Sequence, residues 1–154
     1  MRQHMIGVVG ASTATAAGYE VARQVGHLIA EAGAVLVCGG LGGIMEAACR
    51  GAWGAGGQTL GILPGPDAQN ANPWVTLPVP TNIGHARNVI IAHTAQALIA
   101  VEGEFGTLSE MAIGLKLGKP VVAIDSWPGL PGVIYVNSPA DAVARALAEI
   151  KDFD

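Results

Sequence analysis

The sequence predicts a doubly wound, Rossmann-like α/β domain with a mostly parallel sheet flanked by helices. Short runs rich in valine, isoleucine and leucine alternate with longer helical patterns, which is typical of βαβ units. Hydrophobic residues make up 51% of the chain and charged residues only 13%, as expected where helices bury both faces of a sheet. We see no internal boundary, so we expect one nucleotide-binding domain over residues 1–154.

The first half of the chain carries three predicted strands separated by two predicted helices. The strands are apolar runs at residues 5–10, 35–38 and 59–63. A helix is expected from about residue 16 to 32, because Val21 and Val25 belong to an apolar pattern with helical spacing that a glycine ends. A second helix is expected over about residues 44–55, where a glycine pair follows.

The second half begins with an exposed loop at residues 64–73, which is rich in proline, asparagine and glycine. An extended piece at residues 75–79 comes next. The remaining predicted strands are 97–101, 121–124 and 133–136, and the predicted helices lie around 85–94, after Gly106 and after Ser138. Ser138 is the expected N-cap of the last helix, with Pro139 at its first position.

Three glycine turns follow predicted strands and indicate where a ligand binds. Ligands of doubly wound sheets lie at the carboxyl ends of the strands, where the strand order reverses. Each turn alone is equally well explained as a tight β–α connection, whereas three that converge favour a binding site. The expected ligand- or phosphate-binding residues in and after these turns are Gly10, Ser12, Gly40, Gly42, Gly43, Met45, Gly103, Gly106 and Thr107.

The third of these turns opens a helix that is suited to a phosphate. A helix N-terminus offers unpaired backbone N–H groups and the positive end of the helix dipole. Gly103 and Gly106 let the backbone approach a ligand without an obstructing Cβ. Glu110 lies about one turn further along and is expected to face the same cleft. These residues predict a phosphorylated small molecule held beside a carboxylate.

A second group of candidates lies at residues 84–88, before an apolar helical run. Arg87 is expected to pair with a ligand phosphate or with Glu110, and a structural ion pair or an arginine on the helix surface is the alternative. His85 is expected to cap or pack more than to bind the ligand.

Several other classes of function are disfavoured. The first strand is not followed by G-x-G-x-x-G, and no P-loop occurs, which argues against NAD, FAD and ATP hydrolysis. The net charge is −4 and basic residues are scattered, so no nucleic-acid partner is expected. No apolar run reaches the length of a membrane span, so we expect no membrane partner and a cytoplasmic location. Cys38 and Cys49 are expected to be buried thiols, and no metal site is predicted.

Three segments together resemble the Lonely Guy family, formerly described as lysine decarboxylases, whose signature is P-G-G-x-G-T-x-x-E. These segments are residues 39–47, 85–88 and 102–110. The resemblance spans roughly residues 5–125. It is closest to the branch that contains the molybdenum cofactor carrier proteins, because Asn88 follows Arg87 where Lonely Guy enzymes have a lysine.

The resemblance implies two functions of different classes. Carrier-branch proteins bind a large phosphorylated pterin-type cofactor, so we expect a carrier or sensor that binds a nucleotide or the molybdenum cofactor and needs no other cofactor. Lonely Guy enzymes hydrolyse the N-glycosidic bond of nucleoside 5′-monophosphates, so the alternative is a phosphoribohydrolase with Arg87 and Glu110 as catalytic residues. An oligomeric scaffold with a vestigial pocket is a third interpretation.

Departures from the enzyme signature favour binding over catalysis. Glu102-Gly103-Glu104 replaces Pro-Gly-Gly, and Asn88, expected among the ligand contacts, replaces a lysine. The two additional carboxylates would repel a phosphate unless they face solvent or meet a cation. We expect Glu104 to face solvent, with a metal ion bridging it to the ligand as the alternative.

The resemblance also implies a homodimer or homotetramer, with helices packed across a two-fold axis. The candidate contact residues share apolar side chains on two predicted helices: Val89, Ile90, Ile91, Ile113, Leu115 and Leu117. The same side chains would equally fill the core beneath the sheet, and the sequence does not separate these two roles.

Overall fold

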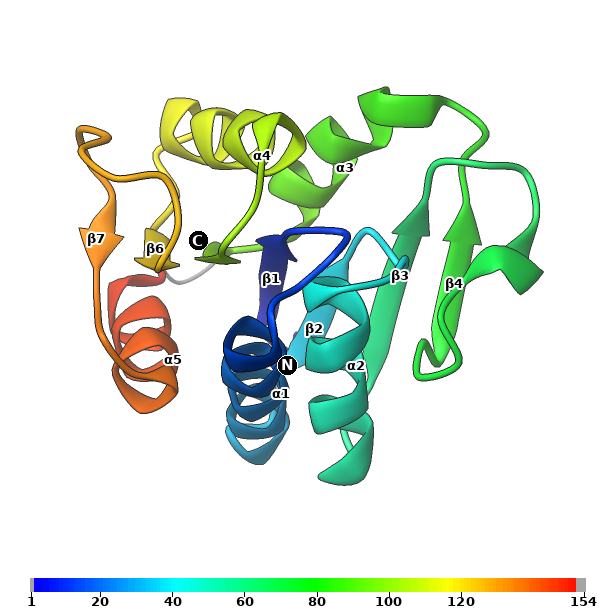
Figure 1. Ribbon diagram of the computed structural model, residues 1–154, viewed down its shortest axis with the longest axis horizontal. Coiled ribbons are helices and arrows are strands. Elements are labelled where there is room, and N and C mark those ends of the chain that lie inside the picture. Colours follow the sequence, from blue (N-terminus) through cyan, green and yellow to red (C-terminus); the bar gives the residue numbers. More distant parts are fainter. Residues whose placement is uncertain (1, 152–154) are drawn as a thin grey trace.

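The computed structural model describes residues 2–151 and shows a seven-stranded sheet between two layers of helices (Figure 1). The strands are β1 (Met5–Gly10), β2 (Val35–Cys38), β3 (Thr59–Leu63), β4 (Leu77–Pro80), β5 (Ala97–Val101), β6 (Val121–Ile124) and β7 (Ile134–Tyr135). Their order is β4-β3-β2-β1-β5-β6-β7, and each neighbouring pair is parallel. The predicted α/β fold is confirmed, and its sheet is parallel throughout the described residues.

Helices cover both faces of this sheet. They are α1 (Ala16–Glu31), α2 (Ile44–Gly54), α3 (Arg87–Thr94), α4 (Phe105–Lys116) and α5 (Pro139–Glu149), with 3-10 helices η1 (Ala68–Asn70) and η2 (Gly84–Ala86). Figure 1 shows α1, α2 and α5 on one face and α3 with α4 on the other. No helix within residues 2–151 combines the length and the apolar character that crossing a membrane would require.

Each face of the sheet has its own apolar core, which explains why the strands are apolar without interruption. Successive strand residues point to opposite faces. In β5, Leu98 therefore packs with Ile91 and Met111 beneath α3 and α4, whereas the adjacent Ile99 packs with Val25 beneath α1, α2 and α5. All five side chains are fully buried.

The strand order reverses between β1 and β5. The chain runs outward from β1 through β2, β3 and β4, then returns to pair β5 on the other side of β1. Gly10 at the end of β1 is in register with Val101 at the end of β5. The turns after these two strands therefore lie side by side at the carboxyl edge of the sheet, where doubly wound folds bind ligands.

Helices α1 and α2 approach each other closely because each presents a glycine to the other's backbone. A Cβ on Gly26 would lie 1.9 Å from the carbonyl oxygen of Ala48. A Cβ on Gly51 would lie 1.8 Å from the carbonyl oxygen of Arg23. Neither separation is possible for real atoms, so the contact requires glycine on both helices.

Most predicted boundaries are reproduced within a residue or two, and the exceptions arise where local hydrogen bonds decide the end of an element. The helix predicted after Gly106 begins at Phe105 with Glu104 as its N-cap, which places Gly106 in the first turn. The helix predicted around residues 85–94 starts as 3-10 helix η2 and becomes α-helical at Arg87. The predicted Ser138 cap is confirmed, and its hydroxyl accepts from the N–H three residues later at 3.1 Å.

The edge strands differ most from their predictions. The extended piece predicted at residues 75–79 pairs with β3 as β4, over 77–80, and the strand predicted at 133–136 pairs with β6 over only two residues. Pro78 and Pro80 deprive β4 of two backbone donors, so the sheet is protected from adding a further strand.

The two cysteines lie together in the core. The Sγ of Cys38, at the end of β2, is 3.4 Å from the Sγ of Cys49 in α2, and both thiols are free. The predicted buried thiols are confirmed. The N–H of Gly40 donates to the Cys38 Sγ at 3.3 Å, which ties the turn after β2 to the core.

Candidate functional site

A pocket of about 280 Å³ lies at the carboxyl edge of the sheet, beside the point where the strand order reverses. We call it the central pocket. It contains most of the residues predicted to contact a ligand: Gly10, Ser12, Met45, Arg87, Asn88, Gly106, Thr107 and Glu110. The turn after β1 and the first turns of α2, α3 and α4 supply these residues, so segments far apart in the sequence meet at one cavity.

Glu110 occupies the most unusual environment in the central pocket. Only 8% of its surface is exposed, and within the described residues no group hydrogen-bonds to its carboxyl. Burial raises the pKa of this carboxyl to about 8, and the nearby charge of Arg87 opposes the rise only in part. Below that pH the group is neutral and has an O–H that can donate to a ligand.

The guanidinium of Arg87 is anchored at one side and open at the other. Its Nε donates to the carbonyl oxygen of Ile62 at 2.9 Å, and its Nη1 donates to the side-chain oxygen of Asn88. Two of the five N–H bonds of a guanidinium are used in this way, which leaves three. Nη2 lies close to Gly39. A Cβ added at Gly39 would come within 2.7 Å of this nitrogen, so a larger residue there would displace the guanidinium.

No ion pair within 4.0 Å joins Arg87 to Glu110 among the described residues. The two groups are nevertheless close enough to influence each other. Burial lowers the pKa of Arg87, whereas the charge of Glu110 raises it. The structure therefore places a buried cation and a buried acid in one pocket without a direct contact that would satisfy either.

Asn88 connects α3 to the first turn of α4. Its Nδ2 donates to the Oγ of Ser109 at 3.2 Å, and that hydroxyl donates to the carbonyl oxygen of Gly106 at 2.6 Å. The other end of the Asn88 amide accepts from Arg87. Asn88 lines the central pocket as predicted, yet both ends of its amide are bonded to the protein.

The first turn of α4 directs backbone donors toward the central pocket. Within the described residues, the N–H groups of Gly106 and Thr107 have no protein acceptor, because the intrahelical pattern starts with Leu108, whose N–H donates to Glu104 at 3.0 Å. Thr107 is buried, with 3% of its surface exposed. Together with Arg87, these donors make this side of the pocket electropositive.

Four predicted contacts lie outside the central pocket: Gly40, Gly42, Gly43 and Gly103. Turn geometry accounts for three of them. Gly40 and Gly43 have positive φ angles of 76° and 64°, and Gly43 is the N-cap of α2. Gly103, with a φ of 107°, packs against Thr107 and lines a neighbouring, larger pocket. These glycines form the turns that position the lining residues, and they do not line the central pocket themselves.

The central pocket also contains five residues that were not predicted as contacts: Ala11, Thr13, Leu41, His85 and Glu104. His85 and Glu104 are exposed, and each lies two residues before a predicted contact. This proximity in the sequence is the feature from which their place in the pocket could have been predicted. The other three carry no charge or motif that sets them apart. Residues 2–151 hold no group of three or more histidine, cysteine or acidic side chains placed to bind a metal ion.

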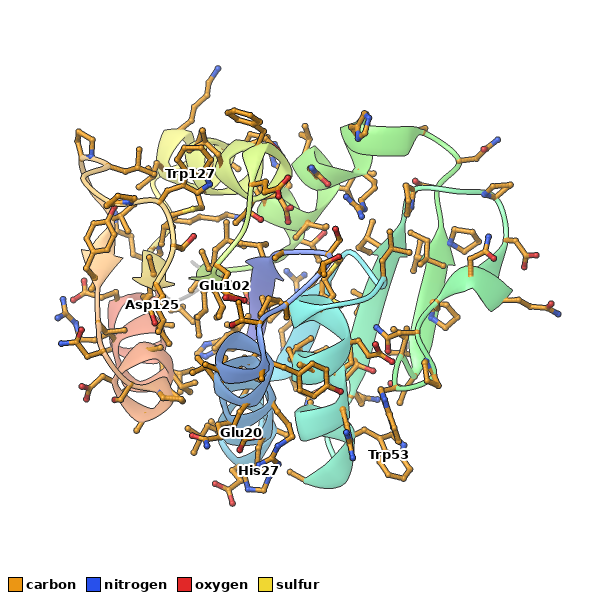
Figure 2. All side chains as sticks on the ribbon, viewed as in Figure 1. Glu20, His27, Trp53, Glu102, Asp125 and Trp127 are labelled. Atoms are coloured by element: carbon orange, nitrogen blue, oxygen red, sulfur yellow. The ribbon has the colours of Figure 1, made fainter. Side chains whose placement is uncertain are left out.

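Glu102 is turned away from the central pocket and caps α1 (Figure 2). Its carboxylate accepts from the backbone N–H of Thr15 at 3.1 Å and from the Thr15 hydroxyl at 2.8 Å. Thr15 is the N-cap of α1. The negative charge of Glu102 therefore faces the positive end of a helix. Its φ of 53° places it in the left-handed region, which these contacts hold at a cost of about 1 kcal/mol.

The apolar residues that were predicted to fill either the core or a subunit contact are divided by the structure. Ile91 is fully buried in the core. Ile113 and Leu115 are partly buried against the same core. Val89 and Ile90 are 43% and 37% exposed, and Leu117 is 37% exposed.

The sequence matches the SLOG cluster4 family over residues 3–149. Among solved structures, the molybdenum cofactor binding protein of Rippkaea orientalis is 35% identical, with a TM-score of 0.91 and coverage of 98% of this chain and 99% of that one. The molybdenum cofactor carrier protein of Chlamydomonas reinhardtii is 32% identical, with a TM-score of 0.85 and coverage of 96% and 98%.

A relative from Oryza sativa subsp. japonica, a probable cytokinin riboside 5′-monophosphate phosphoribohydrolase, is 34% identical over 106 residues. This match covers 66% of the present chain but only 43% of the rice protein. The predicted resemblance to the Lonely Guy family and to its carrier branch is confirmed by these matches.

Proposed function

This chain belongs to the SLOG cluster4 family, and we propose that it binds a phosphorylated small molecule in the central pocket and acts as its carrier. The ligand that we propose is a molybdopterin-type cofactor, with a nucleotide as the other candidate. One observation carries the proposal. Among the described residues, three N–H bonds of the buried Arg87 guanidinium have no acceptor, and Arg87 lines the same pocket as Gly106 and Thr107, whose backbone N–H groups are free.

An anion would complete this arrangement. Among the described residues no fully buried side-chain nitrogen or oxygen lacks a partner, so the free N–H bonds of Arg87 are open to water in the pocket, and an anion would replace that water with a charged acceptor. A phosphate would accept from Arg87 and from the backbone of Gly106 and Thr107, while the dipole of α4 stabilises its charge. Glu110 would not repel the phosphate at neutral pH, because its neutral form offers an O–H donor.

Similarity to a solved molybdenum cofactor binding protein and a solved molybdenum cofactor carrier protein supports a carrier role more than an enzymatic one. Both of those proteins align with nearly the whole of the present chain, whereas the phosphoribohydrolase relative is matched over less than half of its own length. A carrier must bind without consuming its ligand. The bonded amide of Asn88 and the retracted carboxylate of Glu102 are consistent with a pocket organised for binding.

The alternative is a nucleoside 5′-monophosphate phosphoribohydrolase, and the position of Glu110 favours it. In that reaction water attacks the anomeric carbon while the base departs, so positive charge develops on the sugar. The ionised form of Glu110 would stabilise that charge and orient the water, and Arg87 would hold the phosphate. Because the pKa of Glu110 is about 8, turnover would increase as the pH rises through that value.

Binding and turnover can be separated in one experiment. The protein is titrated with AMP and with molybdopterin in a thermal-shift assay, since a ligand that binds the folded state raises the melting temperature. Samples that show a shift are then analysed for free base. Arg87→Ala should abolish the shift, and Glu110→Ala tests whether any released base depends on this pocket.

A shift with molybdopterin and no reaction product supports the carrier proposal. Adenine released by the wild type but not by Glu110→Ala would replace it with the hydrolase. If neither ligand shifts the melting temperature, or if Arg87→Ala responds like the wild type, the central pocket does not bind phosphorylated ligands and the proposal fails.

A further inference from the structure

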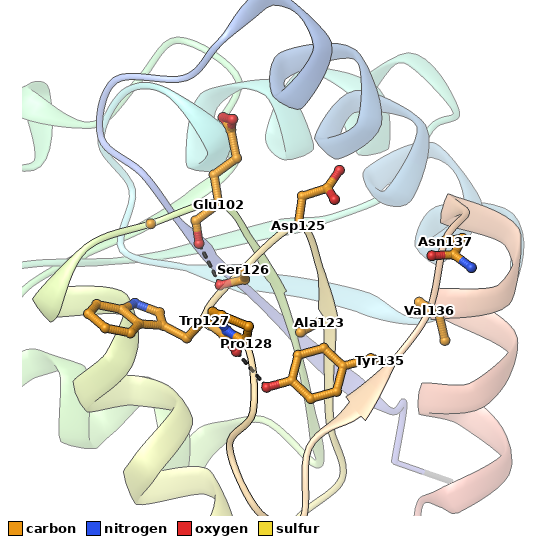
Figure 3. Close-up of a pocket in the computed structure, with 10 residues that line it drawn as sticks. Glu102, Ala123, Asp125, Ser126, Trp127, Pro128, Tyr135, Val136 and Asn137 are labelled. Atoms are coloured by element: carbon orange, nitrogen blue, oxygen red, sulfur yellow. Dashed lines mark hydrogen bonds between the residues drawn. The ribbon is translucent and has the colours of Figure 1, made fainter.

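A second and larger pocket opens at the same edge of the sheet, beyond the turn that follows β5. It has a volume of about 740 Å³ and lies at the carboxyl ends of β5 and β6, beside β7 (Figure 3). Gly103 lines this second pocket, and the adjacent Glu104 lines the central pocket. A single turn of the chain therefore separates the two cavities.

The chemistry of the second pocket is opposite to that of the central pocket. Within residues 2–151, its charged lining residues are two acids, Glu102 and Asp125, and no lysine, arginine or histidine lines it. Figure 3 shows these carboxylates on one side of the pocket, and Trp127 and Tyr135 on the other. Such walls would repel a phosphate, whereas they suit a flat ring that carries hydrogen-bond donors.

Asp125 is the free acceptor in this pocket. The Glu102 carboxylate is already bonded to Thr15, whereas within the described residues no hydrogen bond or ion pair uses the carboxylate of Asp125. Asp125 has a φ of 48°, in the left-handed region that aspartate adopts more readily than most residues. The end of β6 thus presents an exposed carboxylate to the second pocket.

Hydrogen bonds join the loops that form the walls around Asp125. The hydroxyl of Ser126 donates to the carbonyl oxygen of Glu102 at 2.6 Å, which joins the loops after β5 and β6. The indole N–H of Trp127 donates to the carbonyl oxygen of Glu104 at 2.9 Å. The hydroxyl of Tyr135 accepts from the N–H of Leu130 at 2.9 Å and donates to the carbonyl oxygen of Trp127. A preformed pocket loses little entropy on binding.

The two pockets differ in the size of the ligand that they can hold. Binding sites for small molecules measure about 300–1,000 Å³. The central pocket, at about 280 Å³, lies at the lower end of this range, whereas the second pocket, at about 740 Å³, lies well within it. The second pocket therefore offers more space than the central pocket for the part of the ligand that bears the ring.

We propose that the second pocket binds the ring of the ligand, and that this ring is a 2-amino-4-oxopyrimidine fused in a pterin. This inference rests on the proposed function, in which the central pocket holds the phosphate. The edge of such a ring presents a ring N–H and an amino N–H in parallel. The two oxygens of Asp125 accept both, in the same fork that an arginine makes with a carboxylate. The ring of Tyr135, which is 45% exposed, offers an apolar face for stacking.

Neopterin tests this assignment directly, because it carries the 2-amino-4-oxopteridine ring and no phosphate. Its binding to the full chain is measured by quenching of its own fluorescence. The wild type should bind it, and Asp125→Asn should bind at least tenfold more weakly, because an amide replaces one acceptor with a donor. Asparagine tolerates the left-handed conformation, so the backbone is preserved. Asp141→Asn, an equal change of charge in α5, is the matched control and should bind like the wild type.

Arg87→Ala separates this proposal from the proposed function. It should lose binding of AMP, measured by thermal shift, and keep binding of neopterin, because it alters only the central pocket. Failure of the wild type to bind neopterin overturns the ring assignment, as does equal binding by Asp125→Asn. Loss of neopterin binding in Arg87→Ala also overturns it, because the ring would then occupy the central pocket. In each of these cases, binding of AMP that depends on Arg87 leaves the proposed function standing.

Discussion

The side-chain oxygen of Asn88 accepts a hydrogen bond from Nη1 of Arg87, the residue directly before it. The same amide donates to Ser109, whose hydroxyl bonds to the backbone of Gly106. A continuous chain of hydrogen bonds thus links the cationic side of the central pocket to the glycine turn of α4. The guanidinium and the backbone donors are fixed relative to each other, which lowers the entropy cost of binding an anion between them.

Asn88→Ala should therefore weaken binding of AMP about tenfold, although both ends of the Asn88 amide are bonded to the protein. The reason is that Arg87 loses the acceptor that orients it, although its charge remains. Ser109→Ala breaks only the connection to α4 and should cost less than Asn88→Ala. Calorimetric titration of the two variants measures both effects. If Ser109→Ala proves as harmful as Asn88→Ala, the contact between Arg87 and Asn88 is not what orients the guanidinium.

Arg87→Lys should bind AMP at least tenfold more weakly than the wild type, although the charge is conserved. A lysine ammonium cannot donate to Ile62 and Asn88 while it also presents a planar set of N–H bonds to a phosphate. Arg145→Lys is the control, because Arg145 is exposed and its nitrogen lies 3.8 Å from Glu149 in a surface pair of little energetic value. Equal affinity of Arg87→Lys and the wild type would show that charge alone matters here.

Glu110→Gln should make the stability of the folded protein less dependent on pH. The carboxyl has an ordinary pKa of 4.5, and burial raises the pKa in the folded state to about 8. Between these values the folded state keeps a proton that the unfolded state has released, so the free energy of unfolding falls as pH rises. The loss is on the order of 4 kcal/mol by pH 8, at 1.36 kcal/mol for each pKa unit.

Urea denaturation of the wild type and of Glu110→Gln at pH 5, 6.5 and 8 measures this difference. The variant should be the more stable of the two at pH 8, and the gap should narrow toward pH 5. A gap that stays constant with pH would mean that Glu110 does not retain its proton in the folded protein.

Gly26→Ala should destabilise the fold by about 3 kcal/mol or more, because its Cβ would overlap the backbone of Ala48 where α1 meets α2. Gly54→Ala provides the contrast. Gly54 also lies in a helix, at the end of α2, but a Cβ there would meet nothing within 4 Å. Its replacement should stabilise the protein by about 0.5–1 kcal/mol. Thermal denaturation of both variants tests the pair, and similar melting temperatures would contradict the packing argument.

The elements that the sequence predicts best are those that depend on local composition. β5 is an uninterrupted apolar run and is buried at every position, so its boundaries are the predicted ones. The position of Glu110 is also predictable, because a helix that starts at a glycine turn carries its next turn into the same cleft. The short edge strand β7 is predicted less well, since only its pairing with β6 defines it.

Roles that depend on distant residues could not be predicted. Glu102 was expected near the ligand, and only the fold brings it to Thr15, 87 positions earlier in the chain. No local pattern in the sequence predicts that residue 26 must be glycine, because the requirement comes from the backbone of another helix. Asn88 was expected among the ligand contacts; the structure places it at the pocket and also shows that its amide is bonded to Arg87 and Ser109.

The contact between Glu102 and Thr15 has a consequence for ligand choice. In dinucleotide-binding folds, the N-terminus of the helix after the first strand receives the diphosphate. Here that position already holds a carboxylate that belongs to the chain itself. A covalently tethered group acts at an effective concentration on the order of millimolar. NAD or FAD would have to displace this internal competitor, so we expect the protein to bind dinucleotides poorly.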